Sequence, residues 1–162
     1  MVLYWAIKMQ ATEFIQYINH FPHFKKHFKG IFSIDTLPKS LGYRKFLICN
    51  TDFQNGNGKH WIFFGQTEKN IIELFDSLGI DEQKKKLLYE YCKFDKEIIF
   101  NTTPFQDTNT STCGLFVLYY FFERLFNLDL DFEELLNLIF DEDISKNEKT
   151  VVEFQKDFEK LV

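Results

Sequence analysis

The chain has 162 residues, a length typical of one domain that can bury a sizeable core, and we expect a single domain over residues 1–162. Its formal net charge of −5 argues against a protein built mainly to hold nucleic acid, since such proteins are basic. The 21 phenylalanines predict a core filled with aromatic rings.

The cysteines and the first residues of the chain bear on the cellular compartment of the protein. Cys49, Cys92 and Cys113 are an odd number of cysteines with no metal-like spacing, which predicts reduced thiols in an intracellular setting. The first ten residues lack the basic start and apolar core of a secretory signal. No apolar run approaches the roughly 18 residues that a membrane helix needs. We therefore expect a protein that is neither secreted nor bound to a membrane.

Apolar periodicity predicts an α+β chain, in which helices flank a small and mostly antiparallel sheet packed on a central helix. The Asn-Gly-Asn-Gly turn signal at 55–58 predicts that the first two strands pair antiparallel. The expected elements are, in chain order, a helix over Val2–Asn19, a short helix over His23–Lys29 ended by Gly30, a loop from Phe32 to Pro38, strands over Lys45–Asn50, His60–Phe64 and Ile71–Asp76, a helix from Asp81 to about Cys92, a strand over Glu97–Phe100, a helix from Cys113, and helices near Phe132–Phe140 and Glu148–Leu161.

The stretch from Pro104 to Glu123 is a polar loop that runs directly into an apolar segment. Leu115–Phe122 is a continuous apolar or aromatic run, and it continues to Phe126, which is long for a strand and normal for a helix. Ser111 and Thr112 offer the side-chain oxygens of an N-cap at its start. We therefore predict a buried helix that begins at Cys113.

A cysteine in the first turn of a helix has particular chemistry. Free backbone N–H groups and the positive end of the helix dipole favour an anion there, which lowers the pKa of a thiol and makes it a better nucleophile. The Cys113 N–H can point at a developing oxyanion. Gly114 has no side chain, so a substrate backbone can approach the sulfur. The alternative is that Cys113 is a small buried hydrophobe, as most free cysteines are.

Three further polar residues lie at ends of predicted elements, where groups from separate elements can converge. A cysteine nucleophile needs a base and a group that orients the base. His60 begins one strand and Asp76 ends the next, so they can meet at one end of the sheet as base and orienter. Gln106 lies seven residues before Cys113 and can supply a second oxyanion donor. Singly, His60 could be a half-buried strand residue, Asp76 a turn residue and Gln106 a solvated amide.

Other signals have simpler explanations. His20, His23 and His27 are spaced i, i+3, i+7, but no nearby cysteine or acid completes a zinc site, so we predict no metal and no cofactor. The basic runs Lys25–Lys26 and Lys84–Lys86 are explained by solvated helix faces.

The sequence resembles the adenain-like cysteine proteases of adenoviruses, which also occur in virophages and Polinton/Maverick elements. Order and spacing of the shared motifs hold over about Phe28–Phe122. The residues that carry the resemblance are Gly58–Ile62, Leu74–Gly79, Gln106 and Thr112–Phe116, with similar stretches at Phe28–Ser33 and Ile48–Thr51.

The resemblance implies a papain-like core read in circularly permuted order, with the histidine and the acid before the cysteine. It implies that Cys113 is the nucleophile, His60 the base, Asp76 the orienter and Gln106 an oxyanion donor, while Trp61 packs beside the imidazole and limits water access. It also implies endopeptidase cleavage of viral capsid or core precursors during virion maturation, often at Gly-containing motifs. The expected location is the virion and the host-cell interior, and we expect a monomer.

Alternatives within and beyond this clan stay open. The seven-residue interval from Gln106 to Cys113 is similar to adenain, whereas SUMO and NEDD8 proteases usually have six. Asp76 stands where adenain has Glu and matches the SUMO-protease branch. A ubiquitin-like deconjugase is therefore the second hypothesis, and a non-enzymatic binding module that keeps the fold is the third. Adenain responds to a disulfide-linked peptide and to DNA, but the position of Cys92 and the acidic charge support neither activator here.

Overall fold

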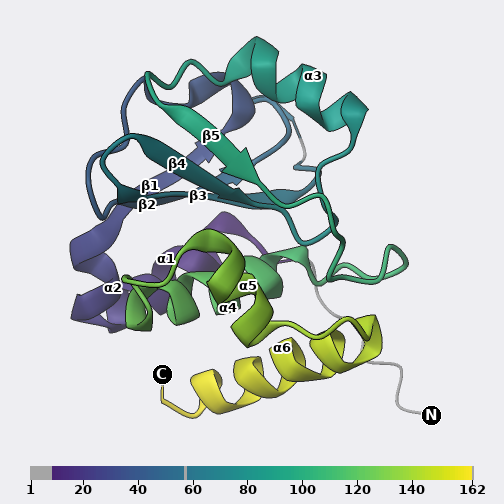
Figure 1. Ribbon diagram of the computed structural model, residues 1–162. Coiled ribbons are helices and arrows are strands. Elements are labelled where there is room, and N and C mark those ends of the chain that lie inside the picture. Colours follow the sequence, from purple (N-terminus) through teal and green to yellow (C-terminus); the bar gives the residue numbers. More distant parts are fainter. Residues whose placement is uncertain (1–8, 57, 162) are drawn as a thin grey trace.

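A five-stranded sheet separates two layers of helices in the computed structural model, which describes residues 9–56 and 58–161 (Figure 1). Helix α3 covers one face of the sheet, and the helices α1, α2, α4, α5 and α6 lie on the opposite face, with α6 outermost. The strands are β1 (Phe28–Ser33), β2 (Phe46–Asn50), β3 (Trp61–Glu68), β4 (Ile71–Phe75) and β5 (Glu97–Phe100). The helices are α1 (Ala11–His20), α2 (Pro22–His27), the 3-10 turn η1 (Ile34–Thr36), α3 (Glu82–Tyr91), α4 (Cys113–Phe126), α5 (Phe132–Ile139) and α6 (Ile144–Glu159).

The strand order β1-β2-β3-β4-β5 follows the chain. The two central pairings, β2 with β3 and β3 with β4, are antiparallel as expected, and the two outer pairings are parallel. In the β3–β4 register, Phe63 lies opposite Phe75. The start of β3 and the end of β4 therefore meet at one end of the sheet, which is where His60 and Asp76 lie.

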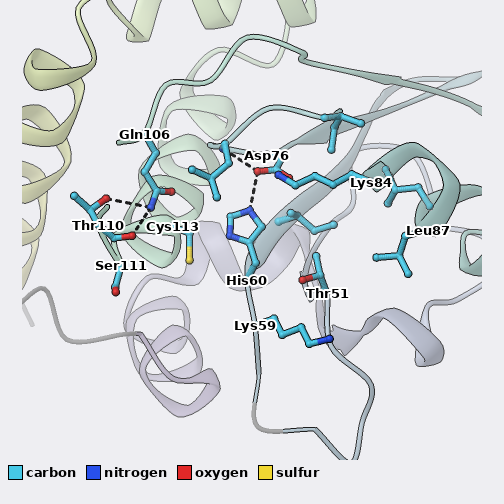
Figure 2. Close-up of a pocket in the computed structure, with 14 residues that line it drawn as sticks. Thr51, Lys59, His60, Asp76, Lys84, Leu87, Gln106, Thr110, Ser111 and Cys113 are labelled. Carbon is cyan, nitrogen blue, oxygen red and sulfur yellow. Dashed lines mark hydrogen bonds and ion pairs between the residues drawn. The ribbon is translucent and has the colours of Figure 1, made fainter. Parts of the chain in front are cut away.

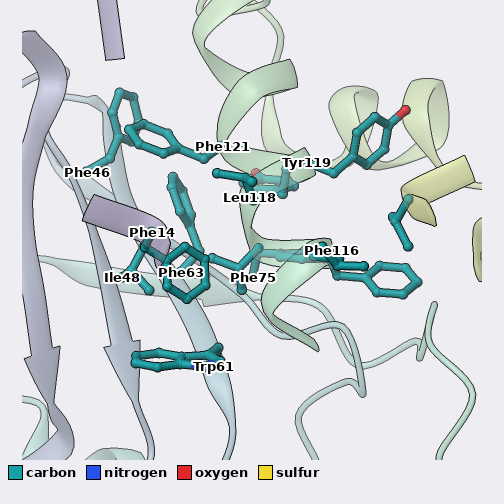
Figure 3. Packing of buried hydrophobic residues seen from close by; sticks show 14 of the residues in the cluster. Phe14, Phe46, Ile48, Trp61, Phe63, Phe75, Phe116, Leu118, Tyr119 and Phe121 are labelled. Carbon is teal, nitrogen blue, oxygen red and sulfur yellow. The ribbon is translucent and has the colours of Figure 1, made fainter. Parts of the chain in front are cut away.

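The two faces of the sheet bury separate apolar clusters because successive strand side chains point to opposite faces. Leu47, Ile62 and Leu74 face the α3 side, where Leu88 of that helix joins them. On the other face, strand residues pack against α4 and its neighbouring helices (Figure 3). The expectation of an aromatic core is confirmed on this face: the rings of Phe75 and Tyr120 stack 4.4 Å apart, and Phe14, Phe46, Phe63, Phe116 and Phe121 are fully buried around them.

Helix α4 is anchored to the sheet at its far end by a buried ion pair. Arg124 Nη2 donates to Glu73 Oε2 at 2.7 Å, and the Tyr120 hydroxyl donates to the same oxygen at 2.6 Å. The other guanidinium nitrogen, Nη1, donates to the carbonyls of Asn127 and Leu130, which fixes the turn between α4 and α5. Both charged side chains are within 2% of complete burial. This end of α4 is therefore tied both to β4 and to the following loop.

The largest departure from the expected elements is strand β1. The segment 28–33 was expected to be the end of a helix and the start of a loop, but α2 ends at His27 and Phe28–Ser33 pairs with β2 in parallel. Gly30, expected to end the helix, lies inside this strand at φ +145°, where a side chain would be strained. Parallel pairing is decided by a partner strand 13 or more residues away, and local sequence signals do not report it.

Smaller differences concern the ends of elements. The expected helix over Val2–Asn19 lies partly outside the described residues, and its described part begins at Ala11 after a capping box between Gln10 and Glu13. Asp81 caps α3 as expected, accepting from the Lys84 N–H. Strand β3 runs on to Glu68, and α6 begins at Ile144, capped by Asp143, earlier than predicted. None of the helices in the described part of the chain is both long and apolar enough to cross a bilayer.

Candidate active site

The four residues singled out in the sequence converge on one cavity of about 340 Å³ (Figure 2). Cys113 is the first residue of α4. His60 directly precedes β3, and Asp76 directly follows β4. Gln106 lies in the loop that leads to α4, and all four line the cavity. The end of the sheet thus faces the start of the central helix, and each element contributes one polar side chain.

His60 lies between the acid and the thiol. Its Nε2 is 2.7 Å from Asp76 Oδ1, so this nitrogen donates to the carboxylate. The other ring nitrogen, Nδ1, is therefore the one available to Cys113, which lies on the opposite side of the imidazole in Figure 2. The carboxylate fixes the ring and its tautomer, as the orienting group of a catalytic triad does.

Asp76 is buried, and several donors hold it in place. Its Oδ1 also accepts from the Leu78 N–H at 2.8 Å, and its Oδ2 accepts from Lys84 Nζ at 3.1 Å. The Asn101 side chain binds the Asp76 backbone at both N–H and C=O. Burial would raise the pKa of Asp76, but the hydrogen bond and charge of His60, with Lys84 and Leu78, hold that pKa below its ordinary value. The group therefore stays a carboxylate that can stabilise a protonated imidazole.

The pKa values of His60 and Cys113 move in opposite directions. Burial would lower the pKa of His60, but its hydrogen bonds to Asp76 and Cys113 and the charges of both raise this pKa to about 9. Burial would raise the pKa of Cys113, but the hydrogen bond and charge of His60, with the N–H groups of Trp61 and Gly114, hold this pKa below its usual value. The two shifts together favour a thiolate–imidazolium pair, which is the reactive form of a catalytic cysteine.

The other two thiols have the opposite character. Burial raises the pKa of Cys49 well above its ordinary value, and it raises the pKa of Cys92 to about 12. Neither lines the cavity that holds His60. Cys113 is therefore the cysteine whose surroundings favour the nucleophilic form.

Gln106 is almost completely buried, and its amide has a defined orientation. The Ser77 hydroxyl donates to Gln106 Oε1 at 2.5 Å, so the amide nitrogen is the atom on the other side. Nε2 donates toward the carbonyl and the hydroxyl oxygen of Thr110, both at 3.2 Å. The backbone N–H of Gln106 also binds the Ser77 carbonyl, so the loop is attached to the end of β4. The solvated-amide interpretation of Gln106 is wrong.

Two residues beside the thiol have surroundings that the sequence did not predict. A side chain at Gly114 would lie 2.5 Å from the Cβ of Met9, so the room expected for a substrate backbone is taken by Met9. The Trp61 indole donates to the Met9 carbonyl at 2.7 Å, and its ring meets Phe14 edge-on at 5.1 Å. Trp61 and Gly114 thus hold the segment that precedes α1 against the start of α4.

The helix cap differs from expectation as well. Thr112 occupies the N-cap position of α4, but its side chain makes no capping hydrogen bond. Its hydroxyl donates instead to Glu148 Oε2 in α6, at 2.8 Å. The first turn of α4 therefore keeps backbone N–H groups directed toward the cavity end, where Cys113 lies.

Sequence reasoning missed the supporting residues. Lys84 was interpreted as part of a solvated face, yet it bridges Asp76 and the Gly79 carbonyl. Its position three residues after the N-cap Asp81 was the available signal, since that geometry turns the side chain back toward the end of β4. Glu148 gave no signal, because only the packing of α6 brings it to the loop before Cys113.

The histidine cluster does not form a metal centre in the described part of the chain. His23 and His27 have their rings 5.4 Å apart, but His27 Nδ1 donates to the Arg44 carbonyl at 2.8 Å. Within residues 9–56 and 58–161, no group of three histidine, cysteine or acidic side chains is arranged to hold an ion.

Among known proteins, matches are found with solved structures only. No protein-family model matches the sequence, and no curated protein matches it. Ten chains of solved structures match, among them the ASFV pS273R protease in its selenomethionine form. That match has a TM-score of 0.36 and 25% identity, and it covers 61% of this chain and 41% of the other. A TM-score this low does not establish a shared fold.

Proposed function

We propose that the protein is a cysteine endopeptidase. The observation that carries the proposal is the buried row Asp76–His60–Cys113, in which the acid fixes the imidazole and the imidazole faces a thiol at a helix N-terminus. A binding module has no need for a histidine pKa raised to about 9 next to a cysteine pKa that is lowered. We further propose that the chain has a papain-like core in circularly permuted order, as the sequence resemblance implies.

The reaction uses one nucleophile and one proton carrier. The Cys113 thiolate attacks the scissile carbonyl carbon, and the carbonyl oxygen becomes an oxyanion. His60 gives its Nδ1 proton to the departing amine as the carbon–nitrogen bond breaks, leaving a thioester on Cys113. Neutral His60 then removes a proton from water, and the resulting hydroxide attacks the thioester. The acid product leaves, and the proton on His60 restores the ion pair with the thiolate.

The oxyanion is bound by the Cys113 backbone N–H and by Gln106. The amide nitrogen of Gln106 carries two hydrogens, and its two long contacts both go to Thr110. One N–H shared between those two oxygens leaves the second N–H for the oxyanion. Removing a donor of this kind typically lowers kcat by about 10²–10³.

The cavity also suggests what the substrate carries beside the scissile bond. Beside Thr51, Lys59 and Lys84, its lining includes a set of apolar side chains, those of Ile62, Leu78, Ile80, Leu87 and Leu88. An apolar substrate side chain fits that part, while the resemblance points to small residues, Gly above all, at the bond itself. The proposed substrates are polypeptides, with viral capsid or core precursors as the class implied by the resemblance, and we propose no peptide or DNA activator.

The test is cleavage of Gly-containing octapeptides and of intact SUMO, NEDD8 and ubiquitin adducts by purified protein. We expect the best peptide to be cleaved, Cys113→Ala to be inactive but folded, and the control Cys92→Ala to retain activity. If one adduct is processed with kcat/KM a hundredfold above the best peptide, the protein is a deconjugase. If Cys113→Ala cleaves as fast as the wild type, Cys113 is not the nucleophile and the proposal is wrong.

A further inference from the structure

Glu148 of α6 binds the loop that carries the proposed oxyanion donor. Its Oε1 accepts from the Asp107 N–H at 2.9 Å and lies 2.8 Å from the Thr110 hydroxyl, while its Oε2 accepts from the Thr112 hydroxyl at 2.8 Å. These three partners lie within the segment between Gln106 and Cys113. One half-buried carboxylate on a distant helix thus holds both ends of the loop.

The direction of the hydrogen bonds connects Glu148 to Gln106. Thr110 Oγ1 is within hydrogen-bond distance of several acceptors, but a hydroxyl has one hydrogen, and the carboxylate is the strongest of them. With that hydrogen on Glu148, the Thr110 oxygen accepts from Gln106 Nε2 at 3.2 Å. The Ser77 hydroxyl fixes the other side of the amide. The carboxylate therefore determines how Thr110 holds the Gln106 amide group.

The neighbouring residue strengthens the attachment of α6 to this loop. Asn147 is buried, and its Nδ2 donates to the carbonyls of Phe105 and Asp141. Phe105 directly precedes Gln106, so two successive residues of α6 bind the chain on both sides of Gln106. A hydrogen-bond network in a buried setting gives a single arrangement only when all its members are satisfied.

We propose that Glu148 is a positioning residue that acts through Thr110 to set the orientation of the oxyanion donor Gln106, while its bond to Thr112 attaches α6 to the start of α4. This inference rests on the proposed function and adds to it a residue outside the part of the chain that carries the sequence resemblance. Glu148 does not line the cavity, so it acts only through the loop.

The experiment compares Glu148→Ala with Glu153→Ala, which removes an exposed acid from the same helix. With the best peptide of the panel, we expect Glu148→Ala to lower kcat by about 10- to 100-fold with KM within twofold, because a donor is misplaced and not lost. Alkylation of Cys113 by iodoacetamide forms no oxyanion, so its rate should stay within twofold. Glu153→Ala should match the wild type in kcat, in KM and in the rate of Cys113 alkylation. If Glu148→Ala does not fold, Glu148→Gln keeps the size and one acceptor oxygen, and a smaller fall in kcat is expected.

A double-mutant cycle decides whether Glu148 acts through Gln106. Gln106→Ala should lower kcat by about 10²–10³, and adding Glu148→Ala should lower it by less than threefold more. Multiplicative losses, or a fall in stability with unchanged kcat, would overturn the positioning role. If the wild type cleaves no substrate, the proposed function fails and this inference fails with it. An active wild type with unchanged Glu148→Ala overturns the inference alone.

Discussion

At the scale of single residues, the three cysteines differ in the form they take near neutral pH. Burial raises the pKa of Cys49 and Cys92, whereas His60 holds the pKa of Cys113 low. We therefore predict that iodoacetamide at pH 7 labels Cys113 at least tenfold faster than the other two, measured by mass spectrometry of peptides. Equal labelling of Cys92, which is partly exposed, would contradict the assigned environments.

The pH dependence of that alkylation tests the partner of the thiol. In the wild type, the rate should rise with pH at a midpoint below the ordinary cysteine value, because protonated His60 stabilises the thiolate. His60→Ala removes the charge and leaves burial, so the midpoint should move upward. An unchanged midpoint would show that the helix terminus alone lowers the pKa of Cys113.

His60 and Asp76 should differ in how much activity their replacement removes. His60→Ala should lower kcat/KM by about 10³ or more, because base and ion-pair partner are lost together. Asp76→Asn should lower kcat/KM by a smaller factor, since an amide oxygen can still accept from His60 Nε2. The comparison needs kcat/KM for both variants, with Glu82→Gln as a control at an exposed site. Equal losses would mean that the charge of Asp76 matters more than its orienting hydrogen bond.

The sequence predicted residues whose role follows from their place at an element end, and it missed those whose role follows from packing. His60, Asp76 and Cys113 each begin or end a strongly patterned segment, so their convergence follows from a simple hairpin facing a helix. Met9 and Glu148 reach the site only because separate layers pack in one way. No local pattern encodes that α6 lies against the loop before Cys113.

At the scale of elements, apolar periodicity located α3, α4, α5 and the four strands β2, β3, β4 and β5. The pattern is strong there because each element has a buried or half-buried face or, in α4, is buried along most of its length. Strand β1 was not predicted, because the residues that follow Pro22 have the pattern of a helix. The parallel partner that makes residues 28–33 extended also lies far along the chain.

The buried ion pair between β4 and α4 should dominate the stability of that contact. Glu73→Gln leaves Arg124 without its charged partner in a dry site, which we expect to cost about 3–5 kcal/mol of unfolding free energy. Urea denaturation measures the free energy of unfolding, and Glu68→Gln on the exposed end of β3 is the control. Replacing both partners by apolar residues, as in Glu73→Leu with Arg124→Met, should recover much of the loss. A cost below 1 kcal/mol for Glu73→Gln would contradict the assignment.

At the scale of the whole molecule, His60 makes stability depend on pH. Because its folded pKa is raised above the unfolded value near 6.5, its contribution is fully present below that pH and is lost as pH rises toward about 9. In the Cys113→Ala variant, only Asp76 is left to raise the pKa of His60. The pH range over which this stability is lost therefore ends below about pH 9. The melting temperature of this variant should fall across this range, relative to His60→Ala with Cys113→Ala. Parallel curves would show that His60 is not held protonated.

The anchoring of α4 at Arg124 has a consequence for the distant thiol. Arg124 lies about three turns beyond Cys113, or about 16 Å along the axis at 1.5 Å per residue. A stiff rod of that length, tilted by only about 4° around its anchored end, moves its tip by about 1 Å, a displacement that can slow catalysis by about a hundredfold. We therefore expect this ion pair, which touches no substrate, to help fix the position of the Cys113 sulfur. The Glu73→Gln variant should lose turnover under conditions in which it is still folded.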